Sequence, residues 1–434
     1  MVIGGLFFAP VVLYATGLVG LSHLIAGLTL VIFLTLLLMN FEIGFLALIF
    51  IRSSLDYMKS FNEQALNLAA LISLALIVLG VFYVLYRRTN ILQFEDSKPF
   101  LIFLAICGLS IAYSPDKTES LSDWLRLVSI FSAYILTRLV FITENKIKMA
   151  LVAIMMSALL PVFVAYYQLA TGNGTVMDGG QARIVGTFLH PNAFASYLLI
   201  VLIFCSSQLL EGTSLVNRGF LGFFTALVFI TFVFTLSRGA WIVFILAMGL
   251  MGVLRYRKLL GFLPPLLLAT IVGVPAVRDR ILNVFEPSHY ASGRSAWEWR
   301  LDTWEEISHL VAEKPFFGHG LSMVEVEFGI LTHNDYLRLI TEVGILGLAA
   351  YLFLIFSTWW RTAQDYKAMN IREIKSFQVG VIAMIAAFFV RSFADNSLRN
   401  TVVMIYFWVL VALLRNLTLL YGERTPSGKL KTEA

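Results

Sequence analysis

Apolar runs long enough to cross a lipid bilayer recur along almost the whole chain. About 20 consecutive apolar residues span the hydrocarbon core as an α-helix, and a helix satisfies its own backbone hydrogen bonds where no water is present. These runs are continuous and do not alternate with polar residues, as barrel strands would. Hydrophobic residues make up 59% of the 434 residues, and the mean hydropathy is +0.82, which excludes a soluble globular protein. We therefore predict an all-α, polytopic helical membrane protein.

The apolar runs predict about 12 (12–14) transmembrane helices. The first 51 residues are nearly continuously apolar and are expected to hold one, two or three short spans. The spans predicted after them are 65–86, 99–113, 122–140, 147–169, 191–209, 219–236, 239–254, 259–276, 336–360, 377–392 and 400–418.

Lys and Arg residues gather in every second loop. Cytoplasmic loops favour these residues, so we place the basic loops in the cytoplasm, and their bias accounts for the net charge of +5 without a nucleic-acid-binding surface. The basic positions are Arg87, Arg88, Arg138, Lys146, Lys148, Arg218, Arg255, Arg257, Lys258, Arg361, Lys367, Arg372 and Lys375, with Arg424, Lys429 and Lys431 in the tail. The loops 115–123, 171–186, 277–333 and 391–399, and the Ser237-Arg238 turn, then face the opposite side.

One of these outer loops is long enough to contain helices of its own. Within it, residues 292–315 place Trp297, Leu301, Trp304 and Leu310 at helical spacing with charges between them, which predicts an amphipathic helix at the membrane interface. We therefore divide the chain into a transmembrane bundle over 1–276, an outer loop over 277–335, and C-terminal transmembrane helices with a cytoplasmic tail over 336–434.

The stretch 315–347 brings Gly, His, Asn, Asp and Arg into a mostly apolar chain. His333 stands just before a predicted span, and histidine is the side chain that most readily exchanges a proton near neutral pH. His333 is therefore a candidate general base at the outer mouth of the bundle, while Asn334 can cap the helix that follows. Glu325, Glu327 and Asp335 are alternative bases.

Three stretches together resemble the O-antigen ligase and polymerase superfamily of bacterial envelope glycosyltransferases. The first is His333-Asn334 followed, after nine residues, by Gly344-Ile345-Leu346-Gly347. The second is Ala182-Arg183-Ile184-Val185-Gly186-Thr187-Phe188 with His190-Pro191-Asn192-Ala193-Phe194-Ala195, and the third is Leu236-Ser237-Arg238-Gly239-Ala240. The segment from Arg300 to Trp304, with Pro315, Gly318 and Gly320, also fits the outer loop of this family. The resemblance covers about residues 180–350.

This resemblance implies a multi-pass protein of the bacterial inner (cytoplasmic) membrane, with its active site on the periplasmic side beneath a large periplasmic loop. It implies a metal-independent, inverting transfer of a glycan from undecaprenyl pyrophosphate to a sugar hydroxyl, with lipid A-core as the expected acceptor. His333 would act catalytically, and Arg183, Arg238 and Arg300 would bind the pyrophosphate. We expect Asn334, His190 and Arg338 to shape the acceptor side of the site.

The chemistry of such a transfer suits these residue types. Arg stays charged and binds phosphate oxygens through two parallel hydrogen bonds, and a general base accelerates attack by a hydroxyl group typically ~10²- to 10⁴-fold. The structural alternatives are that Arg183 and Arg238 extend to lipid phosphates and that Arg300 pairs with Glu298 or Glu305.

Other functions are compatible with the same sequence. A polymerase of the same superfamily, which joins lipid-linked repeats, fits the same motifs. A transporter or flippase ranks behind both, because such proteins carry broken helices and ionisable groups near mid-span, whereas here the charges gather at the outer mouth. We expect no cofactor and no metal, since the spacings of His190, His289, His309 and His319 match no compact zinc motif. The expected partners are the lipid-linked donor, the glycan acceptor and membrane lipids.

Overall fold

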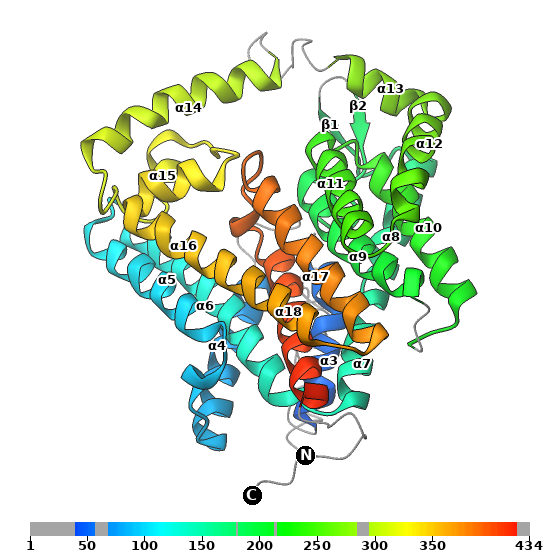
Figure 1. Ribbon diagram of the computed structural model, residues 1–434. Helices are drawn as coiled ribbons and strands as arrows, with labels where there is room; N and C mark the ends of the chain where they lie inside the picture. The colour runs from blue at the N-terminus through cyan, green and yellow to red at the C-terminus, as the bar shows by residue number, and fades with distance from the viewer. Residues whose placement is uncertain (1–39, 57–67, 179–180, 212–214, 284–294, 423–434) are drawn as a thin grey trace, which may run out of the picture.

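The computed structural model describes residues 40–56, 68–178, 181–211, 215–283 and 295–422, and they fold almost entirely into helices (Figure 1). The helices of the first half are α3 (Phe41–Ile51), α4 (Leu68–Arg87), α5 (Ser97–Ser110), α6 (Lys117–Val140), α7 (Glu144–Met156), α8 (Leu159–Thr171) and α9 (Pro191–Glu211). Those of the second half are α10 (Arg218–Phe234), α11 (Arg238–Leu254), α12 (Lys258–Gly273), α13 (Pro275–Leu282), α14 (Ala296–Glu313), α15 (Met323–Phe328), α16 (Asp335–Ala368), α17 (Arg372–Arg391) and α18 (Thr401–Gly422). Of the first 51 residues, which are predicted to hold one, two or three spans, residues 1–39 lie outside the described residues, and α3 is the helix described after them.

Six helical segments of the described residues are long and apolar enough to cross a membrane, or seven if the α12–α13 pair, bent by 94°, is one span. They are α4, α7 with α8, α9, α16, α17 and α18. Three shorter apolar helices lie over Ser97–Tyr113, Arg218–Phe234 and Arg238–Leu254. The all-α, multi-pass membrane architecture is therefore confirmed, whereas the count of about 12 spans stays a prediction.

Several helices begin where a polar side chain caps the backbone. The side chains of Asn40, Asp116, Asn217 and Asn334 each accept hydrogen bonds from two backbone N–H groups of the helix that follows. These N–H groups have no partner within the helix, so Asn and Asp at this position stabilise the helix start. The sequence thus marks each of these transitions from loop to helix.

Helices α9 and α18 form the centre of the bundle. In their most apolar windows 78% and 83% of the residues are buried, against 17% for α4 at the edge. Within these windows both helices carry apolar residues on every side, which is the pattern of a helix surrounded by other helices. Helix α18 packs against α6, and α9 packs against α10 and α17 (Figure 1).

The predicted loop 171–186 contains a short β-hairpin. Strands β1 (Val176–Asp178) and β2 (Gln181–Arg183) pair antiparallel, with Val176 opposite Arg183. The prediction of helices alone overlooked these strands, because three residues are too few to show a period of two. The hairpin fixes the backbone of Arg183 shortly before the chain turns into α9.

Helix α16 bends at Gly344, whose φ of 69° and ψ of −173° are not helical. The segment 315–320 fills the break, because Ile345 N donates to Pro315 O at 2.8 Å and Gly320 N donates to Glu342 O at 2.8 Å. A Cβ at position 344 would lie 2.1 Å from the Phe316 carbonyl oxygen, so only glycine fits. The first glycine of the Gly-x-x-Gly motif therefore docks the outer loop onto α16.

The outer loop forms the amphipathic helix predicted within 292–315. Helix α14 starts at a capping box, in which Ser295 Oγ accepts from Glu298 N and the Glu298 carboxylate accepts from Ser295 N. Its buried Ile307 packs with Met323 and Val324 of α15, and α14 also contacts α16. Helix α14 thus lies over α15 and the beginning of α16 (Figure 1).

A buried ionic network joins α16 and α18 to the start of α5, at the end of α16 remote from His333. Arg415 Nε lies 3.0 Å from Asp96 Oδ2, and Arg415 Nη1 lies 2.7 Å from Asp365 Oδ2. Asp96 also accepts a hydrogen bond from Thr358 Oγ1. The side chains of Arg415 and Asp96 are 2% and 0% exposed, so neither can exchange its partner for water.

We expect Arg415→Met to lower the free energy of unfolding by about 3 kcal/mol or more, because removing one member of a buried pair leaves the other charge buried and unpaired. Chemical unfolding of the detergent-solubilised protein, followed by tryptophan fluorescence, measures the loss. The control is Arg361→Met at an exposed position of α16. Equal stability of the two variants would refute the expectation.

Candidate functional site

A cavity of about 1080 Å³ opens between the outer loop and the helices around α11. The sequence-predicted residues Arg183, His190, Arg238, Arg300 and His333 all line it. They come from β2, the segment before α9, the start of α11, helix α14 and the segment before α16. Residues separated by as many as 150 positions therefore meet at one site. Their chemical roles stay predictions, but their meeting in one cavity is a finding.

Three arginines that line the cavity donate to neutral oxygen atoms. Arg183 Nε donates to the Thr235 carbonyl at 2.8 Å, and Arg183 Nη2 donates to Asn192 Oδ1 at 2.9 Å. The other two are Arg238, which donates to the carbonyl of Arg280 at 3.4 Å, and Arg280, which donates to the carbonyl of Leu236 at 3.3 Å. These contacts orient the guanidinium groups through uncharged oxygen atoms.

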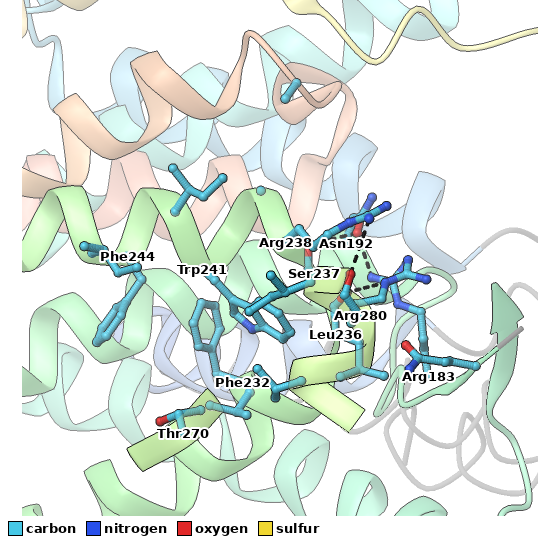
Figure 2. A pocket seen from close by; sticks show the side chains of 18 of the residues that line it. Arg183, Asn192, Phe232, Leu236, Ser237, Arg238, Trp241, Phe244, Thr270 and Arg280 are labelled. Atoms are coloured by element: carbon cyan, nitrogen blue, oxygen red, sulfur yellow. Dashed lines mark hydrogen bonds between the residues drawn. The ribbon is translucent and has the colours of Figure 1, made fainter. Parts of the chain in front are cut away.

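Asn192 connects the two halves of this arginine group. Its amide oxygen accepts from both Arg183 and Ser237 Oγ, each at 2.9 Å. Leu236, just before Ser237, has a φ of 51°, which turns the chain sharply from α10 into α11. The motifs around Arg183 and Arg238 are thus joined by the Asn192 side chain (Figure 2).

A further arginine, Arg391 at the end of α17, also lines the cavity. Its Nε donates to Ser196 Oγ at 2.6 Å, and its Nη2 lies 2.7 Å from Asp395 Oδ2. The other carboxylate oxygen, Asp395 Oδ1, lies 3.8 Å from His333 Nδ1. Asp395 therefore stands between Arg391 and His333.

The turn 391–398 holds the segment that carries His333. Asp335 N donates to the Ser392 carbonyl at 2.8 Å, and Thr332 Oγ1 donates to Asn396 Oδ1 at 2.9 Å. His333 itself adopts a φ of 48°, a conformation that costs energy for a residue with a side chain. Contacts on both sides of His333 maintain this conformation and direct the ring.

The His333 imidazole has one nitrogen beside an acid and the other available for substrate. Nδ1 is buried, and no described residue accepts a hydrogen bond from it, since 3.8 Å to Asp395 is an ion-pair distance. An N–H at Nδ1 faces the Asp395 carboxylate most favourably, which leaves the lone pair on Nε2. This tautomer is assigned from the surroundings, and it is the one that a general base needs.

The other end of the cavity is apolar. Its walls are formed by side chains of α10, α11 and α12, among them Phe232, Trp241, Phe244 and Leu266. Figure 2 shows Phe232, Trp241 and Phe244 at one end of the pocket and the arginines with Asn192 and Ser237 at the other. The cavity thus passes from apolar walls between α10, α11 and α12 to a strongly basic region below the outer loop.

Two predicted site residues are not part of the cavity lining. Asn334 caps α16, accepting from Tyr336 N and Leu337 N. Arg338 lies 2.8 Å from Asp123 and 3.0 Å from Glu342 in a separate buried ionic cluster. Their predicted part in shaping the acceptor side remains a hypothesis, and the structure gives both a role in holding α16.

The alternative bases are also placed by the structure. Glu325 pairs with Arg399, and Asp335 is completely buried, where its carboxylate accepts from Ser392 Oγ at 2.9 Å. None of Glu325, Glu327 and Asp335 lines the cavity. This placement favours His333 as the base.

Sequence reasoning overlooked Arg280, Arg391 and Asp395. The charge pattern places the turn 391–399 on the outer side but assigns it no function, and the motif that contains Asn192 gives that residue no role. The sequence signal that could have indicated Arg391 and Asp395 is their opposite charge at a spacing of four residues, at the outer end of a predicted span. Its connection to His333, 62 positions earlier, could come only from the structure.

Asp395 is ionised far more readily than an ordinary carboxyl group. Burial by itself raises the pKa of Asp395, but Arg391 foremost, and then His333, outweigh it and hold this pKa well below its usual range. The carboxylate is thus negative at neutral pH. It can stabilise positive charge on a neighbouring imidazole without taking the proton itself.

The charge of Asp395 should contribute a pH-dependent stability. Its pKa is lower in the folded than in the unfolded chain, where it is near ~3.9, so the contribution is complete above about pH 4 and is lost as the pH falls further. We expect Asp395→Asn to destabilise the protein by about 3 kcal/mol at neutral pH. Chemical unfolding of both proteins as a function of pH measures the difference, which should shrink on acidification below about pH 4; a difference that grows there would contradict this account.

Among the described residues, no group of three or more His, Cys, Asp or Glu side chains is placed to hold a metal ion. His190, one of the histidines considered for zinc, accepts a hydrogen bond at Nδ1 from Asn192 N at 3.1 Å. His319 lies 2.9 Å from the Leu310 carbonyl. His289 lies outside the described residues.

Residues 223–352 match the family model for O-antigen ligases. The matched segment runs from α10 into α16 and includes Arg238, Arg300, His333 and the break at Gly344. It covers less than a third of the chain, and Arg183 and Asp395 lie outside it. No curated protein matches the chain. The resemblance to the O-antigen ligase superfamily is thereby confirmed over the segment that supplies the outer loop of the cavity.

Proposed function

We propose that this chain, whose residues 223–352 match the O-antigen ligase family, transfers a glycan from undecaprenyl pyrophosphate to a sugar hydroxyl of lipid A-core at the periplasmic face of the bacterial inner membrane. The observation that carries the proposal is the composition of one cavity: apolar walls between membrane helices, a group of arginines, and His333 beside Asp395. A polyprenyl chain, a pyrophosphate and a reacting sugar require these three environments in the same order.

The arginines suit the leaving group. When the bond between the sugar and the pyrophosphate breaks, the electron pair goes to the phosphate oxygen and negative charge develops there. Arg183, Arg238 and Arg280 are already oriented by carbonyl and amide oxygens, so they need little rearrangement when the charge appears. Preorganised charge of this kind is usually the largest contribution to catalysis.

His333 suits the acceptor. Its Nε2 takes the proton of the attacking hydroxyl, whose oxygen forms the new bond to the anomeric carbon of the donor sugar. Asp395 holds the protonated ring by its negative charge. The products are the extended acceptor, with the anomeric configuration inverted, and undecaprenyl pyrophosphate, and no metal ion or cofactor enters the step.

Two features expected of a transporter are nevertheless present. Helices α7 and α8 are separated at Ser157–Ala158, α16 is broken at Gly344, and charges such as Arg52, at 2% exposure, are buried among the helices. Charges are therefore not confined to the residues around the cavity. We still rank glycan transfer first, because the segment that matches the family supplies His333 to the cavity, and His333 lies beside Asp395.

The test is in vitro transfer with purified protein and an undecaprenyl-pyrophosphate-linked glycan. Lipid A-core and a second lipid-linked glycan are offered as separate acceptors. A product on lipid A-core supports the ligase. Growth of the lipid-linked acceptor instead would assign the protein as a polymerase, and the absence of product from folded wild-type protein would refute glycan transfer.

A further inference from the structure

The roof of the cavity is aromatic where it lies next to His333. Trp297 and Trp299 of α14 both line the cavity, and so does their neighbour Arg300. The arginines around Asn192 and the apolar walls of α10–α12 belong to the same cavity. Binding of the prenyl chain and of the pyrophosphate does not account for these two tryptophans.

The two indole rings are held in place by their surroundings. The Trp299 ring lies edge to face with the His333 imidazole, at a centroid distance of 6.1 Å and an interplanar angle of 70°. Trp297 packs in the same manner on Trp304 at 5.8 Å and 79°. Trp304 Nε1 in turn donates to the Thr332 carbonyl at 2.7 Å. The aromatic roof and the residue preceding His333 are therefore tied together.

An indole face is a poor binding surface for a phosphate group, but it packs well against the C–H face of a sugar ring. Such contacts join a flat, weakly negative aromatic surface to the slightly positive hydrogens of the sugar. Tryptophan has only two side-chain torsions, so little entropy is lost when it binds a ligand. A fixed tryptophan beside a general base therefore favours a carbohydrate as the occupant.

We propose that Trp299, assisted by Trp297, forms a platform for the sugar residue next to the donor pyrophosphate. The inference rests on the proposed function and adds the site of the transferred glycan. With the prenyl chain among α10–α12 and the pyrophosphate at the arginines, the first sugar reaches α14, where the contact between Trp299 and His333 sets its anomeric carbon beside the base. Trp299 is thus a substrate-binding and positioning residue.

The experiment compares the binding of two probes to purified protein in nanodiscs. One probe is undecaprenyl pyrophosphate and the other is the same lipid carrying the glycan. Wild type should bind the glycan-bearing lipid about tenfold more tightly, which is the scale of one aromatic contact. Trp299→Ala should lose most of this preference and bind the bare lipid as wild type does, while Trp299→Phe should retain part of it.

The control is Trp360→Ala, which changes an exposed tryptophan on α16 that does not line the cavity, and it should keep the wild-type preference. An unchanged preference in Trp299→Ala would overturn the platform. So would an equal loss of affinity for both lipids, because that result indicates a merely structural or membrane-interface role. If wild type bound neither lipid, the proposed function itself would fail, and the platform with it.

Discussion

His333→Ala should greatly slow glycan transfer while leaving the donor bound. Without Nε2 the proposed proton acceptor beside Asp395 is lost, and a general base contributes typically ~10²- to 10⁴-fold to the rate. We therefore expect kcat to fall by about that factor and the affinity for undecaprenyl pyrophosphate to change little. Single-turnover transfer to lipid A-core, with a parallel binding measurement, separates the two effects.

The matched control is His309→Ala. His309 is an exposed histidine on α14 of the same outer loop and does not line the cavity, so its loss should leave the rate near that of wild type. The rate of Asp395→Asn should lie between those of His333→Ala and His309→Ala, since this variant retains the base but lacks the charge that stabilises the protonated ring. Full activity of His333→Ala would exclude His333 as the base and favour one of the alternative bases, Glu325, Glu327 or Asp335.

Most of the helical architecture could be predicted from the sequence, because it depends on apolar length alone. The predicted span 191–209 is found as α9 (Pro191–Glu211), and the predicted span 400–418 is found as α18 (Thr401–Gly422). Breaks were harder to predict. The run 147–169 is divided into α7 and α8 at Ser157–Ala158, because side-chain hydrogen bonds such as Ser53 Oγ to Ser157 O can replace those of a continuous helix.

The site could be predicted only in part, for a similar physical reason. Residues within recognisable motifs, such as Arg183, Arg238 and His333, can be proposed from the sequence alone. Asp395 cannot, because its importance comes from its 3.8 Å approach to a residue far away in the chain. Arg338 shows the opposite case, since its position near His333 in sequence suggests the site, whereas the helix turns its side chain toward Asp123.

Removing a single arginine from the cavity should cost nearly as much as removing the base. Arg238 is the most informative choice, because its side chain is half-buried and its hydrogen bond to the Arg280 carbonyl is long, at 3.4 Å. Arg238→Met should therefore fold. If its charge stabilises the leaving pyrophosphate, kcat should fall about 10²- to 10³-fold, the effect of losing one preorganised electrostatic donor.

Arg238→Lys distinguishes charge from geometry at this position. Lysine keeps the positive charge but cannot offer two parallel hydrogen bonds to a phosphate. The kcat of Arg238→Lys should therefore be well above that of Arg238→Met if charge dominates, and close to it if the paired hydrogen bonds dominate. Arg361→Met, on an exposed part of α16 remote from the cavity, should retain wild-type kcat and KM. An arginine that anchors the protein to lipid phosphates would affect partition into the membrane and not the chemical step. A wild-type kcat in Arg238→Met would therefore show that Arg238 binds lipid phosphate and not the pyrophosphate of the donor.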